Sequence, residues 1–346
     1  MRHFFFLLIV SVLISIVGVA VYKDAAVRNS QIQPPSQPLP REAYQNVRDF
    51  FVAIVKNQDP KIALQQLQEQ TTTNDSLLRS CHMLTHDIGH AAYEKYKDFA
   101  AAIAYQNDIC NSGYLHGVIE SHFSTSADFS QAVKTVCNKY PKEKFLSWEC
   151  YHGVGHGLMF YTDNDLPRSL ALCDAYDTDF AKGNCANGVF MENFNSDAKM
   201  HPSKFLKPDD PFYPCQEQTP NQKGNCYFYA PEYYLHLHPN DYAGALRWCK
   251  TAELPFQQTC AANVGGNTII QNIHNPKFAE AVCMASSPEQ KIPCIEGMVG
   301  LYINHHGSLE PARTLCEQLE PHNQQTCRIV IESNSGLFTN EAKDRS

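Results

Sequence analysis

Residues 249–260 read CKTAELPFQQTC, and the same step of ten residues between two cysteines occurs in four segments of the second half of the chain. These segments are 215–226, 249–260, 283–294 and 316–327. About 21 or 22 residues separate successive segments, which gives a period of about 34 residues, in the range of helical-hairpin repeats. We therefore expect a series of two-helix units with cysteines at fixed positions.

The stretches between these segments have room for two helices each. The second helix carries an alanine near its middle and a cysteine near its end, as in 242–249 (YAGALRWC) and 278–283 (FAEAVC). Toward the N-terminus the short step is one or two residues longer, in 137–150 and 173–185. The predicted fold class is an all-α solenoid of disulfide-stapled helical hairpins.

The period also predicts the disulfides, which the number of cysteines alone would not. Each bond is expected to join the end of one second helix to the start of the next first helix. The pairs are Cys137–Cys150, Cys173–Cys185, Cys215–Cys226, Cys249–Cys260, Cys283–Cys294 and Cys316–Cys327, and Cys81–Cys110 follows by elimination. Closing such a loop stabilises a fold by roughly 2–3 kcal/mol in the chain-entropy model.

This architecture resembles the Sel1-type and tetratricopeptide-type repeat proteins of bacterial envelopes. The resemblance covers residues 81–327 and rests on cysteine-stapled helical hairpins of about this period. The position of the staple and the Cys-x-x-Gly opening of the units depart from the tetratricopeptide consensus. The resemblance therefore implies a helical-repeat fold and no catalytic residue.

The N-terminal part predicts export. An unbroken apolar run at 4–22 is long enough, at about 1.5 Å per residue, to span a hydrocarbon layer of about 30 Å. It is either a cleaved signal peptide or a retained anchor, and we favour the anchor because the run exceeds the apolar region of a usual signal peptide, about 7–15 residues, and is followed by a tether. Residues 23–41 are a proline-rich tether, 42–80 an N-terminal helical cap and 81–346 the repeat domain.

The composition agrees with an extracytoplasmic protein that is held at a membrane, periplasmic or extracellular, and secreted if the signal is cleaved. The 346 residues include 14 cysteines, and disulfides persist in oxidising compartments. The formal net charge of −8 and the lack of a basic block beyond the N-terminus exclude an electrostatic footprint for nucleic acid. Expected partners are a metal ion, the membrane, and a peptide or glycan in a concave groove.

Histidines concentrate in the units at 81–192. The phrases 81–90 (CHMLTHDIGH), 110–120 (CNSGYLHGVIE) and 150–157 (CYHGVGHG) place them four residues apart or at the same distance from the first cysteine. Residues four apart share a face of a helix, so these imidazoles are expected to converge. Imidazole is the commonest metal ligand. The predicted metal ligands are His86, His90, His116, Glu120, His152 and His156.

The predicted site holds one or two divalent ions of zinc, copper or iron, which accept mixtures of imidazole and carboxylate. Glu120 is the catalytic candidate, as a general base or a bridge between ions, and Glu192 is a secondary candidate. Glycines after the histidines would let a neighbouring helix approach closely. The alternative is that these are hydrogen-bonded core histidines of a repeat that happens to use them.

Residues 86–90 (HDIGH) also resemble the core of the HD-type metal phosphohydrolases, in which adjacent His and Asp bind metal. The upstream His82 lies only four residues away, and no separate distant His and Asp complete the set. The leading functional hypothesis is therefore a metal-dependent envelope enzyme, hydrolytic or oxidative. The alternatives are a non-catalytic protein- or glycan-binding scaffold and metal sequestration without catalysis.

Overall fold

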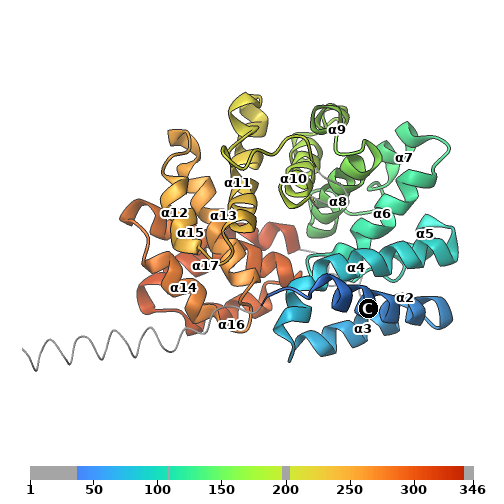
Figure 1. The fold of residues 1–346 in the computed structure, drawn as a ribbon, viewed down its shortest axis with the longest axis horizontal. Helices are drawn as coiled ribbons and strands as arrows, with labels where there is room; N and C mark the ends of the chain where they lie inside the picture. The colour runs from blue at the N-terminus through green and yellow to red at the C-terminus, as the bar shows by residue number, and fades with distance from the viewer. Residues whose placement is uncertain (1–36, 108, 197–202, 339–346) are drawn as a thin grey trace, which may run out of the picture. The chain divides into compact units, whose positions relative to one another are not determined.

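The computed structural model describes residues 37–107, 109–196 and 203–338, and every regular element in these ranges is a helix (Figure 1). The predicted anchor or signal at 1–22 and most of the tether at 23–41 lie outside the described residues. Among the helices that the structure does describe, none combines the length and the apolar character needed to cross a membrane.

Two helices precede the repeats, as the sequence indicates. They are α2 (Arg41–Asn57) and α3 (Pro60–Thr71). Asp59 caps α3 by accepting a hydrogen bond from the Lys61 backbone amide at 2.7 Å, and the proline follows at the first helical position. Asn74 caps the next helix in the same way through the Leu77 amide at 3.0 Å.

Long and short helices then alternate along the chain. The long helices are α4 (Asp75–Tyr96), α6 (Gly113–Thr125), α8 (Phe145–Tyr161), α10 (Asp179–Asn195), α11 (Pro220–Leu237), α13 (Gln257–Ile270), α15 (Pro288–His306) and α17 (Pro321–Phe338). The short helices are α5 (Phe99–Ile103), α7 (Phe129–Thr135), α9 (Leu166–Cys173), α12 (Tyr242–Cys249), α14 (Pro276–Met284) and α16 (Glu310–Gln318), with 3₁₀ turns η1 (Cys215–Glu217) and η2 (Leu254–Phe256).

Each long helix packs against the next long helix in chain order, so α4, α6, α8 and α10 lie side by side (Figure 1). The seven predicted disulfides are all confirmed, and they pair all fourteen cysteines. Six of them join a short helix, or the turn beside it, to the following long helix. The seventh differs, because Cys81 lies in the long helix α4 and Cys110 in the turn before α6.

The described residues also contact one another across the array, between units far apart in sequence. The Arg79 guanidinium on α4 donates to the Gln271 backbone carbonyl at the end of α13, at 2.7 Å. His274 Nε2 lies 3.2 Å from the Thr71 carbonyl oxygen. Units of an open solenoid contact only their neighbours. The solenoid remains a prediction, and these contacts add a closure that it did not include.

Candidate metal centre

Five imidazoles from three adjacent long helices meet in one group, which we call the imidazole cluster. His82 and His86 lie on α4, His116 on α6, and His152 and His156 on α8. The ring centroid of His116 is 5.3 Å from that of His86 and 4.8 Å from that of His156. All except His82 are between 1% and 4% exposed. His116 therefore stands between the pair on α4 and the buried pair on α8.

Glycines allow these helices to approach so closely. Gly117 of α6 faces the His86 backbone carbonyl, and a Cβ added there would overlap that carbonyl. Gly153 of α8 faces the His116 ring, with 2.7 Å between an added Cβ and the nearest ring atom. The glycines that follow His116 and His152 are thus needed because a neighbouring helix occupies the place of a side chain. This confirms the close approach that the sequence predicts.

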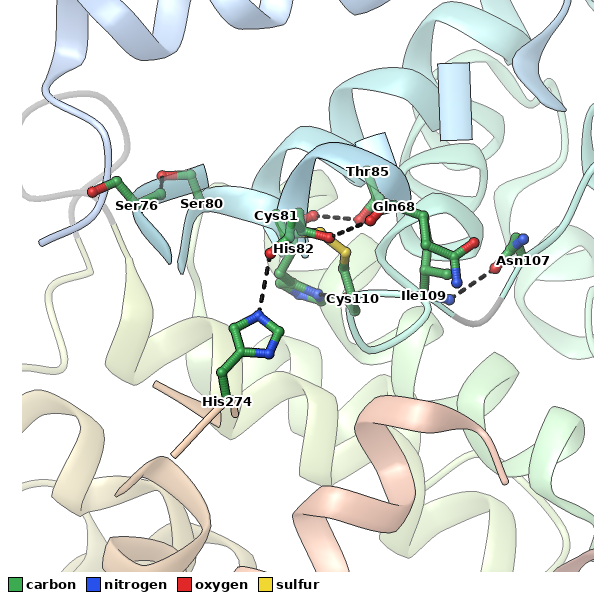
Figure 2. Close-up of a disulfide and its surroundings, with 11 residues drawn as sticks. Gln68, Ser76, Ser80, Cys81, His82, Thr85, Asn107, Ile109, Cys110 and His274 are labelled. Atoms are coloured by element: carbon green, nitrogen blue, oxygen red, sulfur yellow. Dashed lines mark hydrogen bonds between the residues drawn. A yellow bond between two sulfur atoms is a disulfide. The ribbon is translucent and has the colours of Figure 1, made fainter. Parts of the chain in front are cut away.

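The first pair is His82 and His86. We call the two Nε2 atoms, which face each other, the inner nitrogens, and the two Nδ1 atoms, which each contact an oxygen, the outer nitrogens. His82 Nδ1 lies 2.8 Å from the Cys110 carbonyl oxygen, next to the Cys81–Cys110 disulfide (Figure 2). A carbonyl only accepts, so Nδ1 carries the hydrogen and the Nε2 of a neutral ring carries a lone pair. His86 Nδ1 faces Glu120 Oε1 at 3.0 Å and has the same tautomer when neutral. The two Nε2 atoms are 3.1 Å apart.

The second pair repeats this arrangement on α8. His152 Nδ1 lies 2.9 Å from Asn187 Oδ1, and His156 Nδ1 lies 2.8 Å from Glu192 Oε2. The Nε2 atoms of the pair are again 3.1 Å apart. Two nitrogens bound to one tetrahedral zinc ion are about 3.3 Å apart, because each Zn–N bond is about 2.0–2.1 Å. Both pairs therefore have the spacing of two ligands on one ion.

His116 is the least satisfied member of the cluster. It is 1% exposed, and neither of its ring nitrogens has a hydrogen-bond partner among the described residues. The Glu149 carboxylate oxygen nearest to its Nε2 is 3.6 Å away, beyond hydrogen-bond distance. Buried polar groups normally have a partner, so this imidazole is suited to a ligand that would provide one.

Burial favours neutral imidazoles in most of the cluster. Burial, reinforced by the neighbouring imidazoles, holds the pKa of His82, His116 and His152 well below the usual value for histidine. Burial acts in the same direction at His86, but the Glu120 carboxylate outweighs it and raises the pKa of that ring. Metals bind the neutral form of imidazole. Three of the rings are therefore already in the form that binds an ion.

Glu120 has both oxygens occupied by histidines. Its Oε1 faces His86 Nδ1, and its Oε2 lies 2.6 Å from Nε2 of His90, whose side chain is 37% exposed. Burial opposes ionisation, but these two rings hold the pKa of Glu120 well below its usual range. Glu120 is thus ionised and orients His86 from behind, and it connects the cluster to the half-exposed His90.

Three imidazoles of the cluster have a geometry that could hold a metal ion. One nitrogen from each of His82, His86 and His116 lies within 4.8 Å of the others. We call these three residues the tri-histidine site. Of the ligands expected from sequence, the structure brings His86 and His116 into this site, and it places His152 and His156 beside it. It does not bring His90 or Glu120 to the inner side of the cluster.

Sequence reasoning left some of these residues out. The ligands predicted from the sequence do not include His82. The spacing of four residues between His82 and His86, which puts both on one face of a helix, is the signal that identifies it. Asn187 was missed, and Glu192 was ranked second, because their roles depend on how α10 packs against α8. The resemblance to HD-type hydrolases weakens, because the Asp87 carboxylate accepts a hydrogen bond from the Tyr44 hydroxyl of α2 at 2.6 Å.

Comparisons of the chain with protein-family models, with curated proteins and with solved structures found no match. The case for a function therefore rests on the geometry of the cluster.

Proposed function

We propose that this protein is an extracytoplasmic metalloprotein whose tri-histidine site binds a divalent transition metal ion. The observation that carries the proposal is the meeting of three imidazoles, two buried and one partly buried, that each have a nitrogen within 4.8 Å of the others. His82 and His86 have their outer nitrogens fixed by oxygen, as metal-bound histidines usually do. His116 offers two nitrogens without a hydrogen-bond partner among the described residues.

The donor set favours certain ions. Imidazole nitrogen suits zinc, copper and iron, whereas calcium and magnesium prefer oxygen ligands. All fourteen cysteines are in disulfides, so no thiolate competes for the ion. We therefore expect zinc, copper or iron at this site.

A metal-dependent activity is the leading expectation. Three protein ligands leave a tetrahedral ion one open position, which is the pattern of catalytic zinc sites. The burial of His86 and His116 limits what can reach that position to small molecules such as water or dioxygen. In this proposal Glu120 orients His86 and contacts the half-exposed His90, so it acts behind the ion and not as its ligand.

The same burial favours a second candidate, which is metal retention without turnover. Closed and fully buried sites are typical of structural metals. The geometry gives less support to the hypothesis of a protein- or glycan-binding scaffold. Four imidazoles of the cluster are only 1–4% exposed and cannot contact a protein or glycan directly.

Elemental analysis of the oxidised full-length chain, purified without an affinity tag or chelator, tests the proposal. We expect at least one equivalent of zinc, copper or iron, and its loss in a His86→Gln variant. His306→Gln removes an exposed imidazole from the end of α15 and should leave the metal content unchanged. A metal-free protein that takes up no ion on reconstitution would refute the proposal. Assays of hydrolysis and oxidation with the loaded protein then separate the enzyme from the metal carrier.

A further inference from the structure

The tri-histidine site leaves His152 and His156 without a role, although this pair has the same atomic arrangement as His82 and His86. In both pairs the inner Nε2 atoms are 3.1 Å apart. In both pairs a carboxylate holds Nδ1 of the second histidine, Glu120 for His86 and Glu192 for His156. Glu120 lies on α6 and Glu192 on α10, so the same arrangement of two histidines and a carboxylate is formed twice from different helices.

A chain of hydrogen bonds fixes the tautomer of His152. The Asn225 side-chain amide donates to the Gly183 backbone carbonyl at 2.9 Å, so its Oδ1 faces Asn187. The Asn187 amide donates to that oxygen at 3.2 Å and turns its own Oδ1 toward His152. The Tyr229 hydroxyl donates to the same Asn187 oxygen at 2.8 Å. His152 must therefore donate from Nδ1, and its Nε2 carries a lone pair when the ring is neutral.

The facing Nε2 atoms of His152 and His156 thus bring two lone pairs together at 3.1 Å in a buried place. Two species relieve this contact. A proton shared between the rings would make the pair cationic, and a metal ion would accept both lone pairs. The outer Nδ1 atoms of both rings are held by Asn187 and Glu192, as the non-ligating nitrogens of metal-bound histidines usually are, which favours the metal ion.

We propose that His152 and His156 form a second metal site, oriented by Asn187 and Glu192, so that the cluster binds two divalent transition metal ions. This inference rests on the proposed function of the tri-histidine site. His116, a ligand of the first site, lies between the two histidine pairs, with its ring centroid 5.3 Å from those of both His86 and His152. The second ion has two imidazole ligands from α8 and completes its coordination with water or another small ligand.

Zinc titration of the metal-stripped, oxidised full-length protein tests this inference. The wild type should bind two equivalents, and a His152→Gln/His156→Gln double variant should bind one. A His82→Gln/His86→Gln double variant serves as the matched control and should lose the other equivalent. Circular dichroism and thermal unfolding report whether each variant is folded.

Single carboxylate variants keep the test valid if a double variant fails to fold. Glu192→Gln should weaken the binding of one zinc equivalent by about 10–100-fold and leave the other unchanged. Glu120→Gln should weaken the binding of the other zinc equivalent. One equivalent in the wild type, retained in the double variant at 152 and 156, means a proton-sharing pair and overturns the second site. One equivalent lost in both double variants means a single joint site and also overturns it. No binding by the wild type would refute the proposed function as well.

Discussion

At the scale of one residue, His116 is a buried polar group whose unpartnered nitrogens lower stability. Each of its ring nitrogens is buried without a hydrogen-bond partner in the described structure, and such a group costs about 1–3 kcal/mol. Its pKa is held well below the usual value by burial and then by the surrounding imidazoles, so protonation does not relieve this cost near neutral pH. A bound ion would.

Replacing His116 by leucine should therefore separate stability from metal binding. His116→Leu is expected to stabilise the metal-free protein by about 1–3 kcal/mol, because it removes unsatisfied polar atoms and keeps the volume filled. The same variant should lose the ion of the tri-histidine site. Denaturant unfolding of the metal-free protein and zinc titration measure the two effects.

His122→Leu is the matched control on the same helix. His122 is half-buried, and its Nδ1 pairs with the Tyr93 hydroxyl at 3.2 Å. Its replacement should destabilise the protein and leave zinc binding unchanged. If His116→Leu destabilises the metal-free protein as much as His122→Leu does, His116 is a satisfied core histidine and the metal interpretation loses its main support.

At the scale of the helices, the register of the long helices depends on glycine. A Cβ at Gly117 would overlap the His86 carbonyl, whereas nothing lies within 4 Å of a Cβ at Gly300 of α15. Gly117→Ala should cost about 1–3 kcal/mol by overpacking, or more if the backbone cannot shift. Gly300→Ala should stabilise by about 0.5–1 kcal/mol, because alanine is the better helix former. Equal effects in thermal unfolding would contradict the close contact of α4 and α6.

The Cys81–Cys110 disulfide is expected to serve the cluster as well as the fold. It fixes the turn that supplies the carbonyl partner of His82, and Cys110, Asn111 and Ser112 of this turn all have left-handed backbone angles with φ of 53–56°. Such angles are unfavourable for residues other than glycine. Without the disulfide, the turn is free to relax and His82 loses its orientation.

A Cys81→Ala/Cys110→Ala variant should thus lose about 2–4 kcal/mol of stability and also bind zinc about 10–100-fold more weakly. Cys316→Ala/Cys327→Ala provides the control, because it removes a disulfide between α16 and α17, two helices that contribute no residue to the cluster. That variant should lose stability only. Equal zinc affinity in the two folded variants would show that the first disulfide has no role in the site.

The elements could be predicted to different degrees. The disulfides followed from the sequence because a repeated spacing of cysteines constrains the chain locally, between the end of one hairpin and the start of the next. The convergence of His86 and His116 followed from their positions on adjacent helices. The contacts of His152 with Asn187 and of His156 with Glu192 did not, because they depend on the rotation of α10 against α8, which no local pattern determines.

At the scale of the whole molecule, the array closes on itself. Besides Arg79 and Gln271, the Phe145 ring at the start of α8 stacks on Phe338 at the end of α17, with centroids 4.8 Å apart. Lys144 donates to the Gly336 carbonyl at 2.7 Å. These contacts join residues almost 200 positions apart, so no repeat period could have indicated them. They hold α4 and α8, which carry the two histidine pairs, against the C-terminal half of the chain.

Arg79 tests whether this closure stabilises the fold. Its guanidinium donates to the Gln271 carbonyl, and the Gln271 side chain also accepts from the Tyr242 hydroxyl at 2.6 Å. Arg79→Met should cost about 1.5–3 kcal/mol in denaturant unfolding, the usual range for hydrogen bonds to a charged group. Arg48→Met removes an exposed arginine paired with the neighbouring Asp49 and should change stability by less than about 0.5 kcal/mol. If the two variants unfold alike, the ends of the array act independently and the protein behaves as an open solenoid. A larger cost for Arg79→Met means that the units unfold together, as a closed array requires.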